Sequence, residues 1–232
     1  MKRLSPHADT GTEVDPIAAP EPARGRQSSL QRASVVHLPV PEGDAALVEA
    51  LRRDRPGARA ALFDRYAAHV RRVLVRVLGL DSEIPDLVQD VFVTALEGMD
   101  RLEDSTALRG YLTSVAVYSA RALIRKRTRR RILSFLEPER IDRFASVGAT
   151  DEMHEAVRAL YDVLDAMPAD ERIAFALRFV EGMQLPEIAA ACRVSRATVS
   201  RRLQRAQRVF VERAMRHPAL SEWLSGGTRW SR

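Results

Sequence analysis

Apolar residues recur every three or four positions through most of the chain, which is the period of a helix with one buried face. No stretch sustains the alternation of apolar and polar residues that is typical of a half-buried strand, so we expect an all-α protein. A short amphipathic helix is predicted over residues 45–53, and a long one follows Pro56-Gly57 and ends at Gly79. The expected buried residues of the long helix are Leu62, Phe63, Tyr66, Val70, Val73, Leu74, Val77 and Leu78.

Two further helices continue this pattern. The third begins after Ser82, a candidate N-cap, and accommodates Pro85 in its first turn. Its expected inward residues are Leu87, Val88, Val91, Phe92, Ala95, Leu96 and Met99. After a polar loop over residues 100–106, a fourth helix is expected from about Ala107 to Arg131. Its expected inward residues are Leu108, Leu112, Val115, Ala116, Leu123 and Ile124.

The fourth helix ends in six cations within seven residues, from Arg125 to Arg131. Cations near a helix C-terminus interact favourably with the helix dipole, but six of them also repel one another. An anionic partner explains this run, and a solvated helix end explains it equally well.

The helical period is lost from Ser134 to Glu152, which we interpret as a flexible linker. Two helices are expected after it, over residues 153–166 and from Pro168 to Gly182. Their expected inward residues are Val157, Leu160, Tyr161 and Leu164 in the first, and Ile173, Phe175, Leu177 and Val180 in the second.

The chain is therefore expected to form two small helical domains, over residues 44–133 and 153–216, joined by the linker at 134–152. Residues 1–43 hold six of the twelve prolines and few apolar residues, so a disordered leader is expected there. The tail over residues 217–232 shows little pattern and is expected to fray.

A last pair of helices is predicted between Leu185 and Arg208. Pro186 suits the first turn of the first helix, Arg193-Val194-Ser195 forms a break, and Ser195 can cap the second helix. One face of the second helix is apolar, at Val199, Leu203, Ala206 and Phe210. The polar residues on its other faces are Arg196, Ser200, Arg201, Arg202, Gln204, Arg205 and Arg208.

This arrangement is typical of a DNA-binding helix-turn-helix. Arginine can pair with guanine and glutamine with adenine in the major groove, while further arginines contact phosphates. For an isolated basic helix, a solvated helix packed on its own domain is the simpler explanation. The preceding short helix, the tight break and the capped start favour DNA binding here.

Composition agrees with a polyanionic partner, since the formal net charge is +6 and the isoelectric point is about 10.2. The single cysteine, Cys192, excludes disulfides within the chain and is expected to pack as a small apolar side chain. The five histidines are scattered, so we expect no metal and no cofactor. Because the chain has neither an apolar run of about 18 residues nor a signal-peptide pattern, a cytoplasmic protein is expected.

Two blocks resemble those of bacterial RNA polymerase sigma factors of the sigma-70 superfamily, specifically the short extracytoplasmic-function (ECF) type. The segment from Asp86 to Leu96 is similar to region 2.2, the helix that docks on the clamp helices of the polymerase β′ subunit. Residues 167–172, the pair Leu177-Arg178 and residues 182–208 are similar to region 4. The resemblance covers about residues 44–214.

The resemblance implies a non-enzymatic factor that binds core RNA polymerase at the β′ clamp helices and β flap and directs promoter-specific initiation. An anti-sigma factor is a further expected partner. The implied polymerase contacts are Asp86, Gln89 and Asp90. The implied −10 contacts are the base-capturing loop residues Glu103, Asp104, Ser105 and Thr106, and the helix residues Arg109, Tyr111, Arg121, Arg125 and Arg127. The implied −35 contacts are Ser200, Arg201 and Gln204 for bases, and Arg196, Thr198, Arg202, Arg205 and Arg208 for the backbone.

The chain departs from the family pattern at four positions. Tyr111 stands where the family usually has Trp, while Tyr118 and Ala122 stand where it has Asn and Asp. Arg193 stands where the turn usually has Gly, at a cost of about 1 kcal/mol if the backbone there is left-handed. The runner-up interpretation is a stand-alone helix-turn-helix regulator, which would bind DNA without polymerase. A nucleic-acid enzyme has little support, because no His, Asp and Glu constellation is present.

Overall fold

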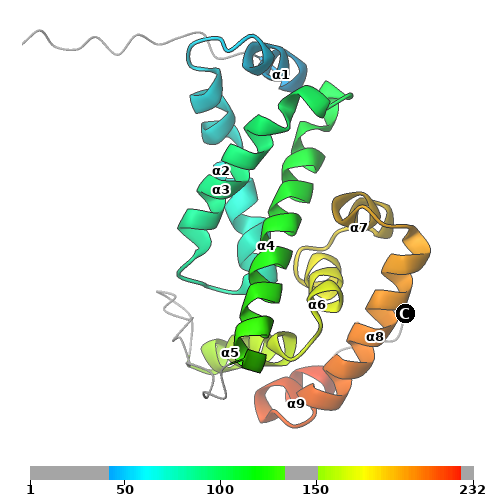
Figure 1. Ribbon diagram of the computed structural model, residues 1–232. Helices are drawn as coiled ribbons and strands as arrows, with labels where there is room; N and C mark the ends of the chain where they lie inside the picture. The colour runs from blue at the N-terminus through cyan, green and yellow to red at the C-terminus, as the bar shows by residue number, and fades with distance from the viewer. Residues whose placement is uncertain (1–41, 134–150, 226–232) are drawn as a thin grey trace, which may run out of the picture. The chain divides into compact units, whose positions relative to one another are not determined.

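The computed structural model describes residues 42–133 and 151–225. All regular secondary structure in these two ranges is helical, which confirms the all-α fold class (Figure 1). The expected leader and linker lie almost entirely outside the described residues. Of the expected linker, only residues 151 and 152 are described, and they belong to the next helix.

The N-terminal half consists of α1 (Asp44–Arg52), α2 (Ala58–Leu78), α3 (Ile84–Glu97), the 3-10 turns η1 (Met99–Arg101) and η2 (Ser105–Ala107), and α4 (Leu108–Leu133). Helices α2, α3 and α4 pack against one another through the apolar faces that their periodicity predicted. Gly79 ends α2 with a φ of 83°, a left-handed value that favours glycine.

Two expectations in this half are wrong. Phe63 is 44% exposed, because it lies at the edge of the apolar face, where its ring is 5.0 Å from that of Phe92. Ser82 does not cap α3. The Asp81 carboxylate accepts a hydrogen bond from the backbone N–H of Glu83 at 3.0 Å instead, and Pro85 in the first turn needs no partner.

The C-terminal half consists of α5 (Asp151–Asp165), α6 (Ala169–Phe175), the π-helical turn η3 (Ala176–Val180), α7 (Leu185–Cys192), α8 (Arg196–Ala214) and α9 (Pro218–Ser225). The helix expected between Pro168 and Gly182 forms, but its second part widens to a π-turn, in which the N–H of Glu181 donates to Ala176 O at 2.9 Å. Ile173, Phe175 and Leu177 are buried as predicted, whereas Val180 is half-buried.

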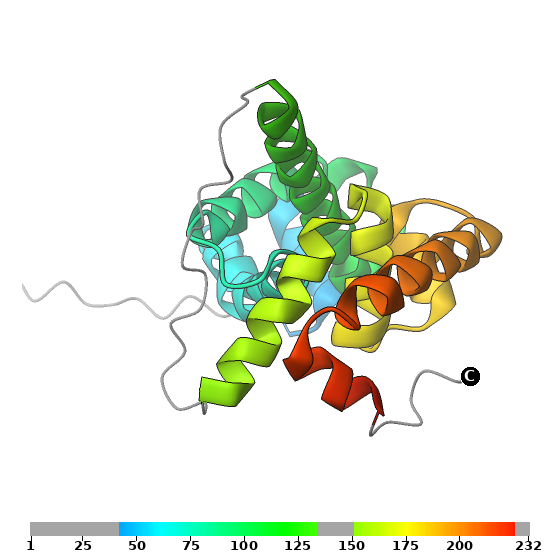
Figure 2. The same ribbon diagram turned by 90° about the horizontal axis from the view of Figure 1, so that it is seen from below.

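The expectation of a tail without structure is wrong for residues 218–225, which form α9. This helix packs against α5 and the end of α8 (Figure 2). Leu220 is buried in that contact. The pattern missed it because a two-turn helix offers too few apolar positions to show a period.

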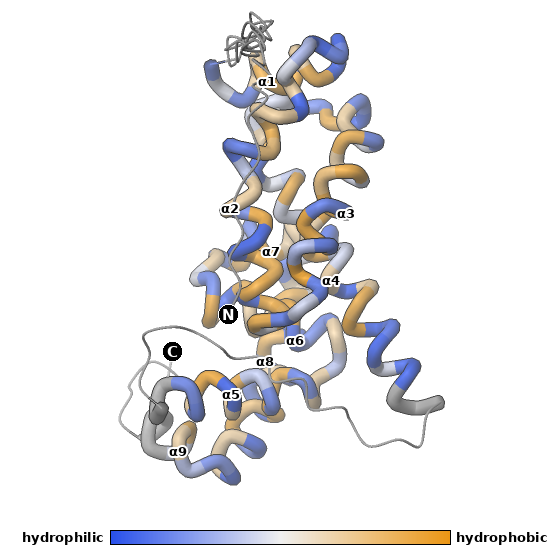
Figure 3. Tube along the Cα trace, turned by 90° about the vertical axis from the view of Figure 1, so that its left-hand side faces the viewer, coloured by the Kyte–Doolittle hydropathy of each residue, from blue (hydrophilic) through white to orange (hydrophobic). Residues whose placement is uncertain are grey.

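The two halves are in contact. Helices α6 and α7 pack on α4, η3 packs on α2, and a single apolar cluster extends from Leu47 in α1 to Leu203 in α8. Figure 3 shows hydrophobic positions gathered where α4, α6 and α7 meet, and hydrophilic positions toward the C-terminal end of α4. Helices α4 and α8 both contact α6.

Candidate nucleic-acid interface

The turn between α7 and α8 sets the direction of the second helix. Arg193 has φ 53° and ψ 49°, a left-handed conformation that is uncommon for any residue other than glycine. The N–H of Val194 donates to Ala189 O at 3.0 Å and that of Arg193 to Ala190 O at 3.1 Å, which is the hydrogen-bond pattern of a Schellman motif. Arg193 therefore has the left-handed backbone that the comparison with the family pattern raised for this position.

The start of α8 is capped as predicted. The Ser195 hydroxyl accepts from the N–H of Thr198 at 3.2 Å and lies 3.0 Å from the Thr198 hydroxyl. The four apolar residues of the predicted inner face are buried, and α8 packs on α6 and α7. This packing turns the opposite face of α8 outward.

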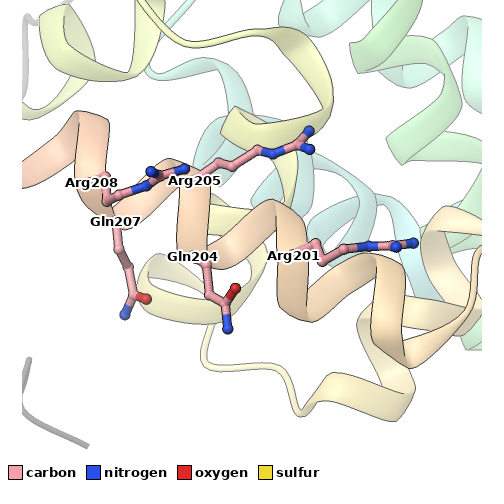
Figure 4. Close-up of a pocket in the computed structure, with 5 residues that line it drawn as sticks. All are labelled: Arg201, Gln204, Arg205, Gln207 and Arg208. Atoms are coloured by element: carbon pink, nitrogen blue, oxygen red, sulfur yellow. The ribbon is translucent and has the colours of Figure 1, made fainter.

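The outward face of α8 is cationic and rich in amides. A surface depression of about 590 Å³ is lined by Arg201, Gln204, Arg205, Gln207 and Arg208 (Figure 4). Gln207 was not among the expected contacts, yet it projects from the same side of α8 as Gln204, three positions earlier. Helical spacing from Gln204 could have identified it.

Two of the expected backbone contacts on α8 take part in ion pairs. The Arg202 guanidinium donates to Asp170 Oδ2 at 3.0 Å, and Arg205 Nη1 lies 4.0 Å from Glu171 Oε1. Arg196, Arg201 and Arg208 are exposed, whereas Thr198 and Ser200 are half-buried. Among these residues Arg202 is therefore turned toward α6, whereas Arg205 reaches Glu171 but stays exposed.

The expected −10 helix, α4, is divided in the same way. Arg109 is exposed, and Tyr111 is half-buried with its hydroxyl donating to Ala95 O at 3.0 Å. Burial raises the pKa of the Tyr111 phenol. Arg121 and Arg125 face Asp170 of α6, with N–O distances of 2.8 and 3.5 Å.

Arg127 is tied to its own half. It donates to both carboxylate oxygens of Asp81 and, at 2.7 Å, to Glu83. The hydrogen bonds to Asp81 are the main cause of a raised pKa for this guanidinium. A side chain held this way stabilises the contact between α4 and the start of α3, so its availability to DNA is lower than the sequence suggests.

The loop before α4 contains an internal cap. The Asp104 carboxylate accepts from the N–H of Thr106 at 2.8 Å and from its hydroxyl at 2.6 Å, and these bonds lower the pKa of Asp104. Glu103 is exposed and Ser105 is half-buried. The loop is therefore preorganised around Asp104 instead of presenting four independent side chains.

The expected polymerase-binding residues share one exposed face of α3. Asp86, Gln89 and Asp90 are all exposed. Val93 follows one turn later and is 55% exposed, which extends this face with an apolar side chain. Val93 was not singled out from the sequence, although its position three residues after Asp90 would have placed it there.

A groove of about 1180 Å³ runs beside α4 and is lined by residues of α2, α3, α4 and α7. Its lining includes Arg109, Tyr111, Tyr118 and Arg121 from α4, and Glu187 and Arg193 from the α7 side. Tyr118, one of the departures from the family pattern, is 66% exposed at this groove. Aromatic and cationic side chains of this kind suit stacking with bases and contact with phosphates.

Cys192 is buried, as predicted, and burial raises the pKa of its thiol. Among residues 42–133 and 151–225, no group of His, Cys, Asp and Glu side chains has an arrangement that could hold a metal ion. No helix within the described part of the chain is long and apolar enough to cross a membrane.

Comparisons with known proteins agree with this geometry. Family models described as Sigma-70 region 2 and Sigma-70, region 4 match residues 62–130 and 157–208. The ECF RNA polymerase sigma-E factor of Escherichia coli (strain K12) is 27% identical over 173 residues, covering 71% of this chain and 90% of that protein. The ECF RNA polymerase sigma factor SigX of Bacillus subtilis (strain 168) is 29% identical over 154 residues, covering 64% and 79% respectively.

Two solved structures share the fold. CnrH, in complex with the cytosolic domain of CnrY, is 21% identical with a TM-score of 0.51, covering 80% of this chain and 99% of that one. The sigma factor RpoE, in complex with the anti-sigma factor NepR from Bartonella quintana, is 22% identical with a TM-score of 0.50, covering 65% and 92%. The chain therefore belongs to the sigma-70 family of RNA polymerase sigma factors and is of the ECF type.

Proposed function

We propose that this sigma factor binds core RNA polymerase through the exposed face of α3 and recognises promoter DNA with α4 and α8. The observation that carries the proposal is a separation of charge. Asp86 and Asp90 present carboxylates on α3, while the outward face of α8 carries arginines and glutamines, in a chain of net charge +6. A protein surface and a nucleic-acid surface are thereby kept apart.

In this proposal the C-terminal domain, residues 153–216, inserts α8 into the major groove of the −35 element. Arg201 and Gln204 have the side chains for guanine and adenine edges, and Ser200 borders them. The proposed phosphate contacts are Arg196, Thr198, Arg202, Arg205 and Arg208, to which we add Gln207 as a polar neighbour of Gln204.

The N-terminal domain, residues 44–133, is proposed to bind the unpaired −10 strand. Flipping a base out of the stack costs a few kcal/mol, which contacts in a pocket and with phosphates must offset. The loop residues Glu103, Asp104, Ser105 and Thr106 are proposed to surround the flipped base. Along α4, the proposed contacts are Arg109, Tyr111, Arg121, Arg125 and Arg127, and Tyr118 joins them at the groove.

The α3 assignment is tested by reversing one charge. Asp90→Arg should weaken binding to purified core polymerase by about tenfold or more, because it places a like charge against a surface complementary to a carboxylate. Asp162→Arg makes the same charge change at an exposed position of α5 and serves as the control. Affinities of the three full-length proteins measured by fluorescence anisotropy decide the matter. Equal affinities for both variants would show that the α3 face is not the docking surface.

The proposed role is non-enzymatic and is exerted in the cytoplasm, where the polymerase acts. An anti-sigma factor is proposed as a further partner, and co-purification of the chain from its own cells would identify it. The competing interpretation, a stand-alone regulator, predicts specific footprints on DNA in the absence of polymerase. A sigma factor should give such footprints only together with core polymerase.

A further inference from the structure

His69 of α2 lies against α4 and uses both nitrogens of its imidazole ring. Nε2 lies 2.8 Å from the Thr113 hydroxyl of α4, and Nδ1 lies 3.1 Å from Arg72 Nη2, one turn later on α2. The Thr113 hydroxyl in turn donates to Arg109 O at 2.9 Å. His69 therefore connects α2 with the turn of α4 that contains Arg109 and Thr113.

These three contacts determine the charge state and the tautomer of His69. A guanidinium has only donors, so Nδ1 must accept the hydrogen bond from Arg72 and carries no proton. The Thr113 hydroxyl has one hydrogen, which it donates to Arg109 O, so it accepts from His69 Nε2–H. Only the neutral imidazole with its proton on Nε2 satisfies the whole set. A second proton, on Nδ1, would place a donor against a donor.

The surroundings of His69 also oppose a second proton. Burial is the main cause of a lowered pKa for His69, followed by the charges of Arg109 on α4 and Arg72 on α2. Glu181, which follows η3, acts in the opposite direction, but its two carboxylate oxygens already lie 3.2 Å from Arg72 Nε and 3.6 Å from Arg76 Nε. Solvent nevertheless reaches the ring, because His69 is only half-buried and lines the groove beside α4.

We propose that His69 is an acid-sensitive switch in the packing of α4 on α2. Gain of a proton at Nδ1 breaks the hydrogen bond from Arg72 and adds a third cation beside Arg72 and Arg109, which weakens the contact between the two helices. Histidine suits this role because it is the side chain whose ordinary pKa lies between pH 5 and 8. The switch goes beyond the proposed function, because it concerns the stability of the N-terminal half whether or not α4 binds DNA.

The direction of the pH effect follows from the protons that the folded and unfolded chains bind. In the unfolded chain His69 takes up a proton near its ordinary pKa of 6.5, whereas in the folded chain it does so only at lower pH. The unfolded state therefore binds more protons in this window. The contribution of neutral His69 to stability is fully present above the unfolded pKa and is lost as the pH falls toward the folded pKa.

The protonation state is tested by NMR of the full-length chain labelled with ¹⁵N at its histidines. The His69 signals are identified as those missing from the His69→Gln variant. At pH 7.5 they should show a proton on Nε2 and none on Nδ1, and on acidification they should titrate with a midpoint below pH 6.5. A proton on Nδ1 at pH 7.5, or a midpoint at or above pH 6.5, would overturn the proposal.

The effect on stability is tested by urea unfolding of the full-length chain at pH 7.5 and 5.5. His69→Gln keeps a donor and an acceptor but cannot gain a proton. Between these pH values the unfolding equilibrium constant should rise about three- to tenfold more in wild type than in His69→Gln. His217→Gln removes an imidazole between α8 and α9 and should keep the wild-type pH dependence. Equal pH dependence of wild type and His69→Gln would contradict the switch.

A variant at an exposed position keeps the test valid if His69→Gln does not fold. Arg72→Met removes the donor to Nδ1 and one of the two opposing charges, so the titration midpoint of His69 should move to higher pH. Arg71→Met removes the same charge from the neighbouring exposed position and should leave the midpoint in place. Equal midpoints for the two variants would show that Arg72 does not keep His69 neutral, and would overturn the proposal.

Discussion

At the scale of single residues, Arg193 keeps the left-handed backbone of the turn at a position where the family usually has glycine. The turn of the helix-turn-helix needs a left-handed residue to complete its Schellman hydrogen bonds, and Arg193 adopts that conformation at φ 53°. For a residue with a Cβ, this left-handed conformation has a strain energy of about 1 kcal/mol, which glycine does not have. The position is therefore a local weak point of the motif.

Replacing Arg193 by glycine should raise the free energy of unfolding by at most about 0.5 kcal/mol, because the relieved strain of about 1 kcal/mol is partly offset by the extra entropy of an unfolded glycine, about 0.5–1 kcal/mol. Urea denaturation followed by circular dichroism measures this change. Arg208→Gly, at an exposed helical position of α8, is the matched control and should lose about 1 kcal/mol. Equal losses for both variants would contradict the account of the turn.

Residue-level roles were the least predictable part of the site. Periodicity identified which faces of α3 and α8 lie outward, and Asp86, Gln89, Asp90 and Arg201 are exposed as that pattern requires. The sequence has no comparable pattern that shows which acidic side chain a given arginine will pair with. Nothing in the sequence linked Arg127 to Asp81, whose carboxylate it meets 46 positions away.

At the scale of elements, the helices with several turns and a clear apolar stripe were predicted with nearly correct ends. Short elements were not. The π-turn η3 keeps nearly the same apolar spacing as an α-helix, so its widening at Glu181 left no trace in the pattern. Helix α9 owes its stability to the packing of Leu220 against other helices, which local sequence does not encode.

The recognition helix provides the sharpest prediction at this scale. Arg201→Ala should relax sequence preference at one or two base pairs of the −35 element, with a loss of about 1–3 kcal/mol of discrimination. Arg208→Ala, a proposed phosphate contact on the same helix, should weaken binding to all sequences alike and reduce the salt slope by about one. Affinities of holoenzyme for a panel of −35 variants measure both. Uniform weakening by Arg201→Ala would remove it from base recognition.

At the scale of the whole molecule, the sequence predicted two helical domains but not their contact. Arg121, Asp170 and Arg202 come together from α4, α6 and α8, and each taken alone is an ordinary charged residue on a helix. Tyr161 was expected to be an inward residue of its own helix, yet Tyr161 and Arg172 bind carbonyls at the end of α2. Such long-range polar contacts depend on tertiary structure. Apolar periodicity predicts helices and their buried faces, but not which distant residues meet.

The central claim is that the chain confers promoter specificity on polymerase, and run-off transcription tests it most directly. Purified core polymerase is incubated with fragments of the genome that encodes the chain, with and without the wild-type protein. We predict discrete transcripts only when both are present, and their loss with Asp90→Arg but not with Asp162→Arg. The absence of any discrete transcript from core polymerase with the wild-type chain would contradict the account.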